Sequence, residues 1–160
     1  MNEERITEIV RSMIAERKEG PKGMTLRLAQ LLAERIEERA AGLGMRVVTA
    51  IADEAGRVKL VRAMDDSFPG SVDVAVNKAY TCIAFRMSTK RLGELAQPGG
   101  ELYGIQYTNG GRIVIFGGGE PLVWKDQIIG ALGVSGGTAE QDTALAAYGA
   151  SLLKEVISCL

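Results

Sequence analysis

The chain has 160 residues, and its 19 Lys and Arg residues nearly balance 20 Asp and Glu residues. This length fits one domain with a substantial core. The balanced charge argues against nucleic acid or an anionic membrane as a partner. The first residues lack the pattern of a secretion signal, and no apolar stretch is long enough to cross a bilayer. We therefore expect a cytoplasmic protein.

Histidine is absent, and Cys82 and Cys159 are the only cysteines. Histidine is the commonest general base and metal ligand. Its absence excludes a Ser-His-Asp triad, a His-ligated zinc and a His-ligated haem within one chain. The cysteine spacing matches no metal motif, so the sequence predicts no metal site and offers no catalytic residues of these kinds.

Residues 2–18 carry a narrow apolar stripe at helical spacing, and the Gly/Pro segment that follows ends the helix. A second amphipathic helix is predicted over residues 28–43. We therefore divide the chain into an N-terminal helix with its linker, residues 1–23, and a domain, residues 24–160. The stripe consists of Ile6, Ile9, Val10, Met13 and Ile14.

Several segments have the composition of strands. In residues 45–53 the β-branched content rises and only Arg46 and Asp53 carry a charge, which predicts a strand covered on both faces or nearly so. Residues 57–64 alternate between charged and apolar side chains and form the second arm of a hairpin. Residues 102–107 and 112–116 are further strand candidates, because they flank Asn109-Gly110, a dipeptide typical of hairpin turns.

The middle of the chain predicts a helix over residues 71–87, and its apolar stripe of Ala and Val indicates a close approach to a sheet. Residues 90–95 form a further turn. Thr138 and Gln141 make a capping box, after which an amphipathic helix runs to the C-terminus. Hairpin-joined strands between these helices predict an antiparallel sheet with helices on both faces.

Residues 117–137 hold seven of the 20 glycines. Gly117-Gly118-Gly119 can present backbone N–H groups to an anion. A tight bend in the sheet is the alternative, because no Lys-Ser/Thr follows as in a phosphate-binding loop. Ser135-Gly136-Gly137 directly precedes the capped helix, so these residues and the helix N-terminus can hold a carboxylate or phosphate.

Four segments resemble, in order along the chain, the GlcG/HbpS-like family, which includes the C-terminal domain of PduO-type proteins. They are residues 53–56, 71–81, 117–122 and 129–137, the last running into Gln141-Asp142. The resemblance implies a profilin-like three-layer α/β/α sandwich around a five-stranded antiparallel sheet. It also implies self-association into a homo-oligomer.

The same resemblance implies a binding module for haem, a corrinoid or a small carboxylate ligand. Other members lie near glycolate or diol metabolism without an assigned reaction. The haem site of PduO-type domains is associated with a histidine, which this chain lacks, so haem would need Tyr, Cys or Met as its ligand, or an interface site without strong axial ligation. The candidates for that ligand are Tyr103, Tyr107 and Cys82.

The expected ligand site combines the two Gly-rich bends with the middle helix. Lys78 lies one position off the apolar stripe of that helix, where it can meet Asp142 or a ligand carboxylate. A solvated or salt-bridged lysine is the commoner arrangement. The full set of ligand-binding candidates is Lys78, Gly118, Gly119, Ser135, Gly136, Gly137 and Asp142.

Three functional hypotheses follow. The favoured one is a non-enzymatic, self-associating binding or accessory module. The second is an enzyme acting on a small hydroxy acid or aldehyde, with Lys78 and Asp142 as its polar groups. The third is a structural assembly protein whose residues 2–18 dock to a protein partner, as short amphipathic helices do on cargo of bacterial microcompartments.

Overall fold

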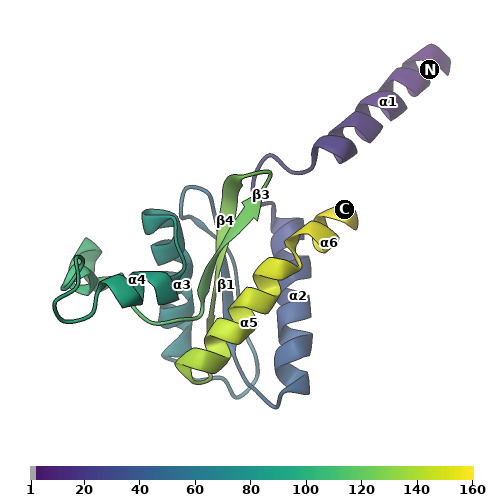
Figure 1. Cartoon of the computed structure of the whole chain (residues 1–160). Helices are drawn as coiled ribbons and strands as arrows, with labels where there is room; N and C mark the ends of the chain where they lie inside the picture. The colour runs from purple at the N-terminus through teal and green to yellow at the C-terminus, as the bar shows by residue number, and fades with distance from the viewer. Residues whose placement is uncertain (1–2) are drawn as a thin grey trace.

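The computed structural model describes residues 3–160, and its sheet lies between layers of helices (Figure 1). The elements in chain order are α1 (Glu3–Glu19), α2 (Leu26–Gly42), β1 (Val48–Asp53), β2 (Val58–Ala63), α3 (Ser71–Phe85), α4 (Thr89–Leu95), the short 3₁₀ helices η1 (Ile105–Tyr107) and η2 (Asn109–Gly111), β3 (Gly119–Trp124), β4 (Gln127–Ser135), α5 (Ala139–Ser151) and α6 (Leu153–Ser158).

The sheet has four strands in the order β2-β1-β4-β3, and every neighbouring pair is antiparallel. The predicted antiparallel sheet is therefore confirmed, but the predicted number of five strands is wrong. The central strands β1 and β4 come from distant parts of the sequence, with Val48 opposite Ser135 and Asp53 opposite Gly130. Each central strand carries one hairpin partner at an edge of the sheet.

Residues 102–107, predicted as a strand, form turns and the 3₁₀ helix η1, and residues 112–116, also predicted as a strand, follow an irregular path. The backbone enters the left-handed region at Gly104 (φ +91°), Asn109 (φ +52°) and Gly110 (φ +67°), whereas a strand needs extended residues. The N–H of Val114 donates to Thr81 Oγ1 at 3.1 Å rather than to a neighbouring strand. This segment therefore packs against α3 and adds no strand.

Helices cover both faces of the sheet (Figure 1). One face packs against α2, α5 and α6, and Val47 and Ile51 belong to its apolar core. The other face packs against α3, where Val48 and Ala50 contact Ala75. All six residues of β1 are buried, as its mostly apolar composition predicts for a strand covered on both sides.

Glycines let α3 lie directly on β4. A Cβ at Gly133 would overlap the carbonyl oxygen of Ala75 and would lie 2.9 Å from the Cβ of Lys78. The facing helix positions Ala75 and Ala79 are also small and buried. Backbone and helix therefore meet without intervening side chains, which is the close approach that the Ala/Val stripe predicts.

Helix α1 extends away from the sheet and its covering helices (Figure 1). Side chains at positions 4–14 are exposed, including every apolar member of the predicted stripe. The exposed fractions of these five side chains run from 44% for Ile6 to 61% for Met13. Among residues 3–160, no helix is both long and apolar enough to cross a membrane.

Substituting Gly133→Ala will destabilise the domain, because the added methyl group would push α3 away from β4. We expect a loss of about 1–3 kcal/mol in the free energy of unfolding, the usual cost of overpacking a core. Urea denaturation measures it. Gly42→Ala is the matched control, since nothing lies within 4 Å of that Cβ position, and it should be neutral or slightly stabilising. Equal losses in the two variants would contradict this explanation.

Candidate functional site

The side chain of Lys78 is fully buried and joins three elements of the fold. Its Nζ donates to Asp142 Oδ2 at 2.9 Å and to the carbonyl oxygen of Val134 at 2.7 Å. These residues belong to α3, α5 and β4 respectively. The ion pair therefore connects the helix on one face of the sheet, through the sheet itself, to a helix on the other face.

Asp142 lies in the first turn of α5, where both its carboxylate oxygens have partners. Its Oδ1 accepts from the N–H of Gly137 at 2.8 Å, while Oδ2 accepts from Lys78. The helix begins with the predicted capping box between Thr138 and Gln141. A carboxylate at a helix N-terminus is stabilised by the helix dipole, so the start of α5 fixes the position of the acid.

The Gly-rich bend before β3 leaves room for the ammonium group. Gly118 has φ +113°, and a Cβ there would lie 2.5 Å from Lys78 Nζ. Its carbonyl oxygen accepts from the N–H of Val134 at 2.7 Å, and the N–H of Gly119 donates to Thr89 Oγ1 at 2.9 Å. Packing and backbone hydrogen bonds therefore explain why positions 118 and 119 are glycine, without any role in ligand binding.

Burial is the main influence on the charge of Lys78. It lowers the pKa of the ammonium below its usual value, and the hydrogen bond and charge of Asp142 raise it back in part. The ring of Phe116 lies on another side, with its centroid 5.0 Å from Nζ. Because a lone buried charge is costly, the ion pair and the aromatic ring together replace the water that the ammonium lost on folding.

Most of the predicted ligand-binding residues thus come together in space. Lys78, Gly118, Gly119, Gly137 and Asp142 surround one buried ion pair, although they come from segments far apart in the sequence. The sequence offered no signal for Phe116 or Thr89, because each owes its role to a tertiary contact.

Ser135 and Gly136 lie at the end of β4, where they make other contacts. The hydroxyl of Ser135 donates to Ser71 Oγ at 3.1 Å, and this contact joins the end of the strand to the start of α3. A Cβ at Gly136 would overlap the carbonyl oxygen of Arg46. Neither residue hydrogen-bonds to Lys78 or Asp142 within the described chain.

The three haem-ligand candidates differ in accessibility. Cys82 is fully buried, and burial raises the pKa of its thiol, which keeps the sulfur protonated. Tyr103 and Tyr107 are 65% and 83% exposed, in the segment between α4 and β3. Among residues 3–160 no group of three or more His, Cys, Asp or Glu side chains could hold a metal ion. Phenolate oxygens are therefore the accessible iron ligands of the predicted set.

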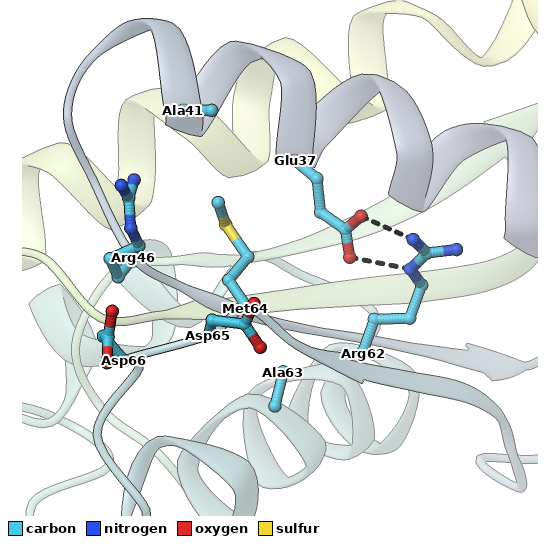
Figure 2. A pocket seen from close by; sticks show the side chains of 8 residues that line it. All are labelled: Glu37, Ala41, Arg46, Arg62, Ala63, Met64, Asp65 and Asp66. Carbon is cyan, nitrogen blue, oxygen red and sulfur yellow. Dashed lines mark hydrogen bonds and ion pairs between the residues drawn. The ribbon is translucent and has the colours of Figure 1, made fainter.

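An open polar cavity of about 670 Å³ lies elsewhere, between the C-terminal half of α2 and the end of β2 (Figure 2). At one side of it Arg62 donates to both carboxylate oxygens of Glu37 at 2.7 Å. Arg46, Asp65 and Asp66 line the same opening. The guanidinium of Arg62 is therefore already engaged by a bidentate carboxylate partner.

Comparison with known proteins places this arrangement in a family. Residues 24–151 match the family described as "Haem degrading protein HbpS-like". The chain belongs to the HbpS-like family. The match covers the sheet, α2, α3 and α5, and it begins after α1.

Three relatives of this HbpS-like chain are informative. An uncharacterised 15.0 kDa protein from the dhaT-dhaS intergenic region of Citrobacter freundii is 46% identical over 123 residues, 77% of this chain and 87% of the relative. The corrinoid adenosyltransferase PduO of Salmonella typhimurium is 42% identical over 68% of this chain, but only 32% of PduO is matched. The structure of a PduOC–haem complex superposes with a TM-score of 0.77 at 34% identity, over 81% of this chain and 94% of PduOC.

Removing one member of the buried ion pair will destabilise the domain strongly. Lys78→Met leaves the Asp142 carboxylate buried without its cation, and we expect a loss of about 3–5 kcal/mol in urea denaturation. Adding Asp142→Asn should recover part of that loss, because the amide oxygen can still accept from Gly137 without a buried charge. Arg91→Ala breaks the exposed pair with Glu94 and serves as the control, with an effect within about 0.5 kcal/mol.

A double variant no more stable than Lys78→Met would show that the charge of Asp142 is not what makes the single substitution costly.

Proposed function

We propose that this HbpS-like chain is a non-enzymatic binding or accessory module for a tetrapyrrole, with haem as the first choice and a corrinoid as the second. The likeness to PduOC in its haem complex, over 94% of that chain, is the observation that carries the proposal. The corrinoid alternative has support from the match to part of a corrinoid adenosyltransferase. A link to diol or glycolate metabolism is part of the same proposal.

The geometry around Lys78 supports a binding role over catalysis. A catalytic lysine must be free to exchange protons or attack a substrate, whereas Lys78 Nζ is engaged by Asp142 and by Val134. For haem, Tyr103 and Tyr107 are the axial ligands we propose, because their phenol groups are exposed and the chain has no histidine. Phenolate ligation of haem iron has precedent in catalase.

Exposed apolar side chains support the further proposal that the module self-associates. Val58 and Val61 on the edge strand β2 are 50% and 37% exposed, and Phe68 is 69% exposed. Val72, at the start of α3, is 36% exposed. Apolar groups gathered on one protein surface commonly mark contacts with another protein.

Titration of the full chain with haemin and with cobalamin, followed by ultraviolet-visible absorption, tests the tetrapyrrole function. We expect saturable binding of haemin with the spectrum of a phenolate-ligated ferric haem. Tyr103→Phe combined with Tyr107→Phe should change that spectrum, whereas Tyr148→Phe, in the opposite helix layer, should leave it unchanged. Absence of saturable binding for both haemin and cobalamin would refute the proposed tetrapyrrole-binding function.

A second candidate function concerns α1, which we propose docks the domain to a protein partner such as the shell of a bacterial microcompartment. The support is that its apolar stripe is exposed along its length and that the family match begins only at residue 24. Amphipathic helices commonly bind by laying such a stripe into an apolar groove of the partner.

Ile9→Glu combined with Met13→Glu should abolish co-purification of the full chain with microcompartment shells, because charges on the stripe oppose burial in an apolar groove. Arg11→Gln, on the same helix, is the control and should co-purify as the unmodified chain does. Circular dichroism checks that both variants remain folded. Retention of shell binding by the double variant would refute the docking role of α1.

A further inference from the structure

The ammonium of Lys78 retains hydrogen-bonding capacity after folding. An ammonium group has three N–H donors, and two of them bond to Asp142 and Val134. No further acceptor bonds to Lys78 among the described residues. The ring of Phe116 packs against the same nitrogen, with the ring centroid 5.0 Å from Nζ. The ring therefore occupies a position in which a further hydrogen-bond acceptor could bind.

Phe116 is the boundary between this ammonium and solvent. Lys78 is fully buried, while Phe116 in contact with it is 48% exposed. Val134 and Asp142, the other partners of the ammonium, are both buried, so Phe116 is the exposed member of the three. Displacing this ring would therefore open a path from solvent to the buried ammonium.

The local backbone leaves the ring of Phe116 room to move. Phe116 lies in a bend outside every helix and strand of the described chain, and Gly117 and Gly118 follow it directly. Its ring can turn outward without breaking a hydrogen bond of the sheet. The contact that holds it inward is an interaction between a cation and an aromatic face, which a charged ligand group can replace.

The start of α5 adds a second attraction for an anion. Gly137 donates to Asp142 Oδ1 immediately before this 13-residue helix begins. The positive end of the helix dipole therefore lies beside the ion pair. A ligand carboxylate near Lys78 would meet the ammonium and this dipole together, and both offset repulsion from Asp142.

We propose that Phe116 is a gate over Lys78 and that, when the ring turns aside, the free N–H of Lys78 binds a carboxylate group of the ligand. This inference rests on the proposed binding function and specifies what the site recognises. The carboxylate can be a propionate of a tetrapyrrole or the acid group of a small hydroxy acid. Lys78 then bridges Asp142 and the ligand, so the ion pair of the closed form stays in place.

Accessibility of Lys78 to reductive methylation tests the gate in the full chain. Formaldehyde with a borane reductant converts exposed lysines to dimethyl-lysine, and peptide mass spectrometry reports the extent at each position. We expect slow modification of Lys78 in the unmodified chain and a rate about tenfold higher in Phe116→Ala, as for an equilibrium shifted toward the open form. Lys90, which is exposed, is the internal reference and should react equally in both.

Phe116→Leu keeps an apolar cover without an aromatic face and should give an intermediate rate. It also provides a folded comparison if Phe116→Ala loses stability. Equal rates at Lys78 in the unmodified chain and in both variants would overturn the gate, and this result does not depend on whether any tetrapyrrole binds.

The same methylation assay, repeated with added ligands, tests whether Lys78 binds a carboxylate group. Haemin and glycolate should each protect Lys78 of Phe116→Ala from methylation, whereas haemin dimethyl ester and ethylene glycol should not. Protection by haemin alone identifies the tetrapyrrole as the source of the carboxylate, and protection by glycolate alone identifies a small acid. If haemin and its dimethyl ester bind and protect equally, the carboxylate inference fails while the tetrapyrrole function stands.

Discussion

The fold depends on a charged group held where water cannot reach it. Lys78 Nζ donates hydrogen bonds to a carbonyl oxygen of β4 and to a carboxylate of α5. A buried ammonium is costly unless it is paired and hydrogen-bonded, so these elements must meet at one place. Gly118 and Gly133 follow from the same constraint, because a side chain at either position would overlap the ion pair or the helix that carries it.

Local sequence patterns predicted several of the helices and strands that pack around the buried ion pair. The capping box at Thr138 placed the start of α5, and the mostly apolar composition of β1 identified a strand covered on both faces. The pairing of Lys78 with Asp142 could be suggested but not established, since 64 positions separate the two residues along the chain. A lysine beside an apolar stripe is usually solvated, whereas the tertiary packing of α3 against β4 buries this one.

The segment between α4 and β3 was mispredicted for a physical reason. Asn109-Gly110 favours a hairpin turn when the flanking residues can pair as strands, but Gly104 and Gly111 add further left-handed backbone on both sides. The apolar residues Ile113 and Val114 are buried against α3 instead, where Thr81 accepts from the backbone of Val114. Phe116 emerges from this irregular path, so no periodic pattern could have placed its ring over Lys78.

The arrangement of Asp142 explains how a ligand can join the site without dismantling the fold. One carboxylate oxygen remains bonded to Gly137 at the start of α5, and the other remains bonded to Lys78. A ligand carboxylate needs only the donor that faces Phe116, so it replaces an aromatic contact and leaves every hydrogen bond between the layers intact. Stability and recognition then use different N–H groups of one ammonium, which allows a structural ion pair to serve also as part of a binding site.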